Sequence, residues 1–305
     1  MTQEERNALQ RWAEHHKALA ADVPVEDWLS QSEIDKKRKK LEEDPIKWIK
    51  YFFPKYAKYE FAPFHVRAIK RVIEHDEWYE VLSWSRELAK STVAMFICMY
   101  LALTKRKRFF VLASATIDSA KRLLAPYKIN FESNPRIRQF YGSQVTLGQW
   151  TDGEFTAKCG AKFVALGAGS APRGARNEEV RPDVIYMDDY DTDEDCRNPE
   201  TLKKKWDWFE ASLYPTRSIS EPTLILWCGN IIAKDCCIKK AGAKARHWDI
   251  VNIRDKDGHS TWPAKNTEEQ IDTVLSNIST KSAQAEYFNN PVSEGTIFKY
   301  LPFGK

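Results

Sequence analysis

Short runs of apolar, β-forming residues alternate with helix-length segments along most of this 305-residue chain, and that alternation limits its fold more than any other feature. Strands are predicted at residues 79–82, 109–113, 184–187, 223–227 and 248–253, with a hairpin formed by residues 155–158 and 162–166. Helices are predicted at residues 91–103, 118–131, 199–213, 268–275 and 281–288. The nearly continuous apolar runs at 184–187 and 223–227 are typical of parallel strands that are covered on both faces. The pattern therefore predicts an α/β fold in which helices flank a mostly parallel central sheet.

Composition narrows the class of protein further. Hydrophobic residues make up 43% of the chain and charged residues 30%, which is enough apolar material for a core and excludes a wholly disordered chain. The 47 Lys and Arg residues against 43 Asp and Glu residues leave a net charge of only +4, so any nucleic-acid contact must come from a local patch. The sequence contains no run of about 18 apolar residues, so no membrane span is expected. The six cysteines lack CxxC spacing and indicate reduced thiols.

The segment at residues 84–92 (WSRELAKST) lies between a predicted strand and a predicted helix. Compared with the phosphate-binding pattern G-x-x-x-x-G-K-[ST], Lys90 and Ser91 are in register, but both glycines are missing. A strand-to-helix loop directs backbone N–H groups and the helix dipole at a phosphate, so Lys90 is predicted to reach the β- and γ-phosphates of a nucleotide and Ser91 to ligate Mg²⁺. An ordinary surface turn is the alternative. The predicted nucleotide-binding residues of this loop are Ser85, Arg86, Glu87, Leu88, Ala89, Lys90, Ser91 and Thr92.

Two carboxylates directly follow the apolar strand at residues 184–187. Asp188 is predicted to be the carboxylate on the metal side of the site, and Asp189 is where a general base for an attacking water would lie. A buried carboxylate costs stability unless it has a partner, so such a pair at the end of a buried strand favours a chemical role. The acidic run continues through Asp191, for which a solvated loop is the alternative.

Asn230 follows the predicted strand at residues 223–227. A polar side chain at the end of a central strand, beside the phosphate-binding strand, is predicted to sense the γ-phosphate or the attacking water. A turn formed by Gly229 and Asn230 is the alternative, since Gly and Asn are both favoured in turns.

Taken together, these residues resemble the ATPase domain of the large terminase subunit of tailed bacteriophages, the motor that packages DNA. The motifs that carry the resemblance, in order, are SRELAKST (85–92), GSAPRGAR (169–176), RPD (181–183) ahead of the Asp188–Asp189 pair, CGN (228–230) and AEYFNNP (285–291). The resemblance implies a P-loop NTPase of the additional-strand (ASCE) type with a small helical N-terminal subdomain. Residues 1–47 are expected to form that helical segment, and residues 48–305 the P-loop ATPase domain.

The resemblance also implies roles for individual residues. Arg86 is expected to face the phosphates, and the aromatic patch upstream of the loop places Phe64 and His65 where they would stack on adenine. Two residues depart from the family pattern, because Ala89 stands in place of a glycine and Asp189 in place of a glutamate. The base is therefore Asp189 or Asp191, or hydrolysis is slow. The candidates for an arginine finger or a DNA contact are Arg136, Arg138, Arg173 and Arg176.

The function implied by the resemblance is ATP hydrolysis, with Mg²⁺, that drives double-stranded viral DNA into a procapsid in the host cytoplasm. The implied partners are double-stranded DNA, the portal protein, the small terminase subunit and further copies of the chain in a ring. A large terminase normally carries a nuclease domain after this region, so this sequence is expected to be either an excised ATPase domain or a short gene product, and nuclease activity is not expected of it. One alternative is a catalytically weakened P-loop scaffold that binds DNA or the portal. Another is an ATP-dependent helicase, because residues 114–116 (SAT) match a helicase motif, although they precede the carboxylate strand instead of following it.

Overall fold

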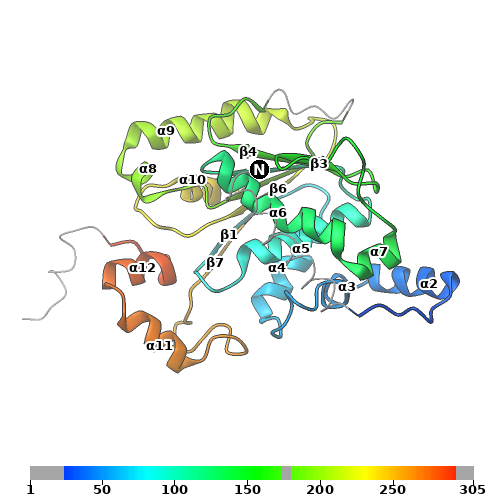
Figure 1. Cartoon of the computed structure of the whole chain (residues 1–305). Coiled ribbons are helices and arrows are strands. Elements are labelled where there is room, and N and C mark those ends of the chain that lie inside the picture. Colours follow the sequence, from blue (N-terminus) through cyan, green and yellow to red (C-terminus); the bar gives the residue numbers. More distant parts are fainter. Residues whose placement is uncertain (1–23, 173–179, 293–305) are drawn as a thin grey trace, which may run out of the picture.

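The central sheet organises the part of the chain that the computed structural model describes, residues 24–172 and 180–292 (Figure 1). Its strands are β1 (Trp78–Trp84), β2 (Phe109–Ser114), β3 (Glu154–Thr156), β4 (Lys162–Gly167), β5 (Val184–Asp188), β6 (Leu224–Cys228) and β7 (His247–Val251). They lie in the order β3-β4-β2-β5-β6-β1-β7. All neighbours pair in parallel except β3, which forms the predicted antiparallel hairpin with β4. The expected mostly parallel α/β sheet is confirmed.

Strand order explains why distant segments of the chain meet. Strand β6 lies between β1 and β5, and Cys228 at the end of β6 is in register with Leu82 on one side and Asp188 on the other. A strand inserted between the phosphate-loop strand and the carboxylate strand is the arrangement expected of the additional-strand P-loop type. Because parallel strands end at the same edge of a sheet, the residues that follow β1, β5 and β6 converge there.

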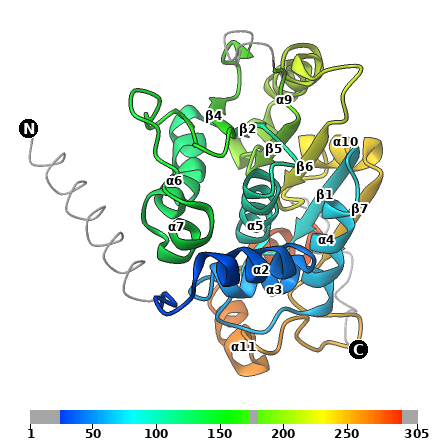
Figure 2. The same ribbon diagram turned by 90° about the vertical axis from the view of Figure 1, so that its right-hand side faces the viewer.

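Helices cover both faces of the sheet (Figures 1 and 2). The helices of the described chain are α2 (Gln31–Glu42), α3 (Pro45–Phe52), α4 (Pro63–Ile73), α5 (Lys90–Leu103), α6 (Ile117–Ser133), α7 (Pro135–Tyr141), α8 (Asp193–Arg197), α9 (Pro199–Trp208), α10 (Cys237–Lys244), α11 (Glu268–Ser276) and α12 (Thr280–Phe288). The predicted helix at 199–213 continues from α9 into a π-helical turn, η2 (Phe209–Leu213), and a short 3-10 turn, η3 (Tyr214–Thr216). None of the described helices is both long and apolar enough to cross a membrane.

The two faces of the sheet bury separate apolar clusters, because successive side chains of a strand point to opposite faces. Leu112 and Tyr186 pack with helices α3 to α6 on one face, where α5 is buried along nearly its whole length. Val111 and Met187, each one residue away along its strand, pack with α9, η2 and α10 on the other face. Figure 2 shows α5 and α9 on the two sides of the strands.

Helices α2 and α3 both pack against the domain: Ile34 of α2 is buried in the apolar cluster that contains α5, and Arg38 donates a 2.9 Å bond to the Phe140 carbonyl of α7. Trp48, Ile49 and Phe52 are fully buried in the cluster that contains α5, and Trp48 Nε1 donates a 2.8 Å hydrogen bond to the Tyr141 hydroxyl of α7. Between residues 24 and 47 the structure describes α2 and the start of α3. The division suggested after residue 47 falls inside α3, whose apolar face belongs to the core of the domain.

Candidate active site

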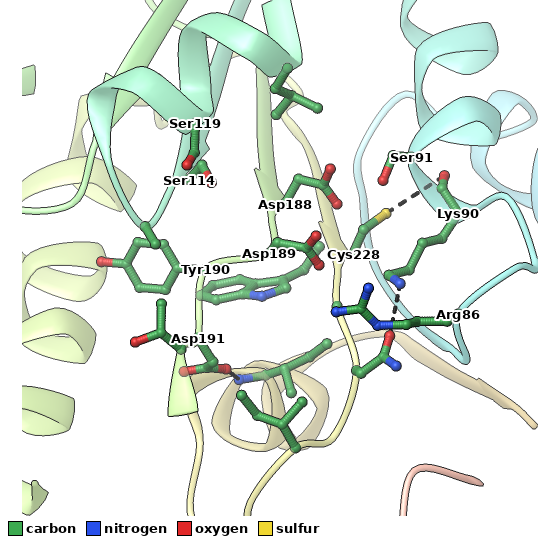
Figure 3. Close-up of a pocket in the computed structure, with 18 of the residues that line it drawn as sticks. Arg86, Lys90, Ser91, Ser114, Ser119, Asp188, Asp189, Tyr190, Asp191 and Cys228 are labelled. Atoms are coloured by element: carbon green, nitrogen blue, oxygen red, sulfur yellow. Dashed lines mark hydrogen bonds between the residues drawn. The ribbon is translucent and has the colours of Figure 1, made fainter. Parts of the chain in front are cut away.

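A cavity of about 950 Å³ opens at the carboxyl ends of β1, β5 and β6. Residues of the 85–92 loop form one wall, residues 188–191 and 228–230 form the floor, and the first turns of α6 form the opposite wall. Figure 3 shows Lys90 and Arg86 on one side and Ser114 and Ser119 on the other, with Asp188 and Asp189 between them. The three predicted motifs therefore meet in one cavity.

The loop after β1 has a strained backbone. Glu87 has φ 68° and Ala89 has φ 58°, and both values lie in the left-handed region that glycine adopts most easily. Ala89 is the N-cap residue of α5, so the first amides of this helix, which have no intrahelical partner, open onto the cavity. Ala89 thus has the backbone conformation that a glycine would adopt most easily, although its side chain carries a Cβ. Such an N-terminus is suited to bind an anion.

Lys90 and Asn230 connect the 85–92 loop to the end of β6. Lys90 Nζ donates a 2.7 Å hydrogen bond to Asn230 Oδ1, and Asn230 Nδ2 donates a 2.6 Å bond to the backbone carbonyl of Glu286. Asn230 is 8% exposed and lines the cavity. The Asn230 side chain therefore bridges Lys90 and α12, which a residue that only forms a turn would not do.

Arg86 lies at the mouth of the cavity, where its side chain is 63% exposed. Its backbone N–H donates a 3.0 Å bond to the Glu286 carbonyl, and its guanidinium forms an ion pair with the Glu286 carboxylate. Arg86, a residue of the 85–92 loop, is thus paired with α12 in this structure.

Asp188 is buried at the end of β5 with one carboxylate oxygen unused. It is 6% exposed, and its Oδ1 has no hydrogen-bond partner among the residues that the structure describes. Burial, and secondly the charge of Asp189, raise the pKa of Asp188 to about 7, while the Lys90 ammonium and the Ser91 hydroxyl act in the opposite direction. An unpaired carboxylate oxygen close to a hydroxyl is a donor set that fits Mg²⁺.

The acidic side chains do not form a complete metal cage. Within residues 24–172 and 180–292, no group of three or more His, Cys, Asp or Glu side chains could hold an ion by itself. Mg²⁺ usually keeps several waters and is bound by one or two protein oxygens together with substrate phosphates. Asp188 and Ser91 therefore fit a Mg²⁺ that is shared with a nucleotide.

The two candidates for the general base have different surroundings. Asp189 is exposed at the floor of the cavity and has φ 41°, held there by a 3.2 Å bond from its backbone N–H to the Cys228 carbonyl. Asp191 also lines the cavity, but its two carboxylate oxygens accept bonds of 2.8 and 2.9 Å from the backbone N–H groups of Cys237 and Ile238 at the start of α10. Asp191 thus caps a helix, which favours Asp189 as the base.

The expectation that Phe64 and His65 stack on adenine is wrong. Both side chains are buried, at 4% and 0% exposed, and neither lines the cavity. His65 Nδ1 accepts a 3.0 Å bond from the Ala62 N–H, and its Nε2 donates a 2.9 Å bond to the Leu88 carbonyl. Burial lowers the pKa of His65 to about 4, so the ring is neutral and supports the loop from behind. Leu88, also fully buried, contacts the core and not the cavity.

The arginine candidates lie elsewhere. Arg136 donates bonds of 2.8 and 2.6 Å to the carbonyls of Pro24 and Tyr51, and its guanidinium lies 4.3 Å from the centre of the Tyr51 ring. This side chain joins α7 to α3 and is not a finger for the cavity. Arg138 is exposed on α7 and does not line the cavity either. Arg173 and Arg176 lie outside the described residues.

Several lining residues were not predicted as part of the site. Ser114 at the end of β2 and Ser119 and Arg122 on α6 form the wall opposite the loop, and Arg122 donates a 3.1 Å bond to Ser119 Oγ. Their signal in the sequence is a polar SAT segment directly after a buried strand. Glu286 joins the site from α12, inside the AEYFNNP motif.

Comparison with known proteins gives a match in fold. No protein-family model matches the sequence, and no curated protein sequence is similar to it. The structure is similar to that of the large terminase of bacteriophage HK97, with a TM-score of 0.54 and 12% identity over 82% of this chain and 55% of that one. It is also similar to the large terminase of a thermophilic bacteriophage in complex with ADP, with a TM-score of 0.50 and 13% identity over 79% of this chain and 56% of that one. The chain spans about half the length of these terminases and shares the fold of their matched part, so the resemblance to the terminase ATPase domain is confirmed at the level of fold.

Proposed function

We propose that this chain hydrolyses ATP with Mg²⁺ and is the motor part of a large terminase, which drives double-stranded viral DNA into a procapsid. The observation that carries the proposal is the bond between Lys90 Nζ and Asn230 Oδ1 in the cavity where Asp188 and Ser91 also lie. A cation, an amide, a hydroxyl and a buried carboxylate from three adjacent strand ends match the requirements of phosphoryl transfer to water.

Each group has a part in the proposed reaction. The triphosphate lies over the first turn of α5, where Lys90 exchanges its bond to Asn230 for the β- and γ-phosphate oxygens. Ser91 and Asp188 are the residues that would hold Mg²⁺, which neutralises charge on the phosphates when it is bound. Asp189 orients the attacking water and accepts its proton, and Arg86 offsets the charge that develops in the transition state.

Asn230 is proposed to couple the nucleotide state to the segment around α12. It contacts Lys90 with its oxygen and the Glu286 carbonyl with its nitrogen. A Lys90 that turns to a phosphate leaves Asn230 Oδ1 free to bond to the attacking water. Movement of that amide changes its contact with Glu286, which also holds Arg86.

The partners are proposed from the fold and the motifs. They are double-stranded DNA, the portal protein, the small terminase subunit and further copies of this chain in a ring, within the host cytoplasm. Arg173 and Arg176 are proposed to reach a neighbouring subunit or the DNA. DNA binding of this kind is electrostatic, so it weakens steeply as the salt concentration rises.

Steady-state phosphate release tests the proposal, with and without double-stranded DNA. We expect Mg²⁺-dependent turnover that DNA changes and that Lys90→Ala reduces to background. Turnover by the unsubstituted chain no greater than that of Lys90→Ala would exclude the ATPase. Unwinding of a short duplex in the same buffer would support a helicase instead.

A P-loop scaffold with weakened catalysis is the second candidate. The left-handed backbone at Ala89 favours it, because a residue with a Cβ is strained there, and so does an aspartate at 189, which is one methylene shorter than glutamate. Calorimetric binding of ATP without any phosphate release would support the scaffold.

A further inference from the structure

A second cavity, of about 330 Å³, adjoins the phosphate-binding loop. Glu87 and Lys265 line both this cavity and the larger one. Lys265 Nζ donates bonds of 2.9 and 2.7 Å to the carbonyl and the carboxylate of Glu87, so the two side chains form the boundary between the cavities. A ligand with its phosphates on the loop would have to pass or displace this pair to extend into the smaller cavity.

The walls of the smaller cavity are mostly apolar and aromatic. Ile253 after β7 and Ile271 on α11 form part of the lining, and the rings of Tyr59 and Tyr287 border it. Apolar walls with a few placed polar groups are typical of sites for small molecules and cofactors. Flat aromatic rings also suit a nucleobase, since every base has a π-face on which they stack.

Asn266 lines this cavity and has a buried side-chain nitrogen without a hydrogen-bond partner among the described residues. The residue is 9% exposed, and the unpartnered atom is its Nδ2. Its backbone is held in place, because its N–H donates a 2.9 Å bond to the Trp262 carbonyl and its own carbonyl accepts a 2.7 Å bond from Ser260 Oγ. A buried amide that is positioned but unpaired is unusual, and a ligand that accepts its hydrogen bond would explain it.

We propose that the smaller cavity binds the adenine base of ATP and that Asn266 reads the base; this inference rests on the proposed ATPase function. An asparagine amide donates to one ring nitrogen of adenine and accepts from the 6-amino group at the same time. On its N7 edge guanine presents only the two acceptors N7 and O6, so it cannot accept one bond and donate the other there. The base site therefore lies between Tyr59, α11 and the end of α12, and takes the place of the buried Phe64 and His65 pair.

Under this proposal Lys265 lies close to the sugar and α-phosphate of the bound nucleotide. Its ammonium lies where the base cavity meets the phosphate cavity, with Glu87 as its present partner. A nucleotide that occupies both cavities brings its sugar and α-phosphate to this position. Lys265 is thus placed to contact the part of the ligand that inorganic tripolyphosphate lacks.

Isothermal titration of the Mg²⁺ complexes of ATP, GTP and inorganic tripolyphosphate tests the proposal. The unsubstituted chain is expected to bind ATP about 10-fold or more tightly than GTP, in the range of a bidentate amide contact. Asn266→Leu, which keeps the volume and removes both polar atoms, is expected to lower ATP affinity to that of GTP and to leave tripolyphosphate binding unchanged. Equal affinity of the unsubstituted chain for ATP and GTP, or full discrimination by Asn266→Leu, would overturn the proposal.

A second variant avoids the buried position. Val274 is 43% exposed and lines the cavity, so Val274→Trp is expected to fill the base site and reduce ATP affinity to that of tripolyphosphate. Leu147→Trp is the matched control, because Leu147 is 94% exposed and lines neither cavity, and it should bind ATP normally. Undiminished ATP affinity in Val274→Trp would refute the base site. Failure of the unsubstituted chain to bind tripolyphosphate would instead refute the proposed function.

Discussion

The ammonium of Lys90 lies 2.7 Å from the side-chain oxygen of Asn230, although 140 residues separate them in sequence. The contact exists because β6 pairs directly with β1, so the residues just beyond both strands meet at one edge of the sheet. The same amide bonds to the Glu286 carbonyl, so Asn230 connects Lys90 with α12, beside the direct contact between Arg86 and Glu286.

Asn230→Ala is expected to lower kcat by about 10²–10³-fold, the usual effect of removing a positioned group that acts in the transition state. The KM for ATP should change little, since Lys90 and the loop amides remain. Asn230→Asp is the contrasting variant, because its carboxylate would hold Lys90 as an ion pair and weaken ATP binding. Steady-state kinetics separate the two effects, and an unchanged kcat in Asn230→Ala would exclude the coupling role.

Asp188→Asn is expected to abolish Mg²⁺-dependent turnover and to raise the stability of the nucleotide-free protein. The carboxylate is buried with an unpaired oxygen, so replacing its charge with a neutral amide reduces the cost of burial. Thermal unfolding without nucleotide gives the stability, and phosphate release gives the activity. Retained turnover would show that Asp188 is not on the metal side of the site.

The two acidic residues beyond β5 should separate catalysis from stability. Asp189→Ala is expected to lower kcat by about 10²–10⁴-fold, the usual contribution of a general base. Asp191→Ala should keep turnover but lower the free energy of unfolding by about 0.5–2 kcal/mol, because the cap of α10 is lost. Urea titrations and kinetics of both variants check this, and a stable but inactive Asp191→Ala would reverse the assignment.

Ala89→Gly tests the strain in the loop. Removing the Cβ from a residue in the left-handed region relieves a strain of roughly 1–2 kcal/mol. Glycine also lowers the free energy of unfolding by about 0.5–1 kcal/mol, because the unfolded chain gains conformational entropy. The variant should therefore be about 0.5–1 kcal/mol more stable in urea unfolding. Ala94→Gly, the same change inside α5, is the control and should lose about 1 kcal/mol. Destabilisation of both variants alike would contradict strain at Ala89.

His65 predicts a loss of stability in acid. Burial lowers its pKa from 6.5 to about 4. As the pH falls below 6.5, His65 is therefore protonated in the unfolded chain but stays neutral in the folded chain until about pH 4. Stability that is present above pH 6.5 is therefore lost as the pH falls, by about 2 kcal/mol at pH 5.

Urea unfolding at pH 7.5 and pH 5 measures that effect. His65→Gln keeps an acceptor for Ala62 and a donor for Leu88 but cannot titrate, so its stability should fall less over this range. Equal losses in the two proteins would mean that His65 is not the group responsible.

Local sequence patterns were enough to predict most elements of the described chain. The strands and long helices follow from side-chain period and from β-branched or aromatic runs, which are properties of neighbouring residues. Helices α3, α4, α7, α8 and α10 were not predicted as such, although α4 and α7 each begin with a proline, Pro63 and Pro135, whose fixed φ suits a helix start.

The sequence by itself determined the strands, the loop that carries Lys90 and the acidic pair at the end of β5, because each depends on residues that are neighbours along the chain. Only the tertiary structure decided that β6 lies between β1 and β5 and thereby brings Asn230 to Lys90. Tertiary packing also buries His65 behind the loop and places Asp191 where it accepts a hydrogen bond from the first backbone N–H of α10. Strand order and burial depend on contacts between segments far apart in the chain, and the local period of a segment does not encode its partners.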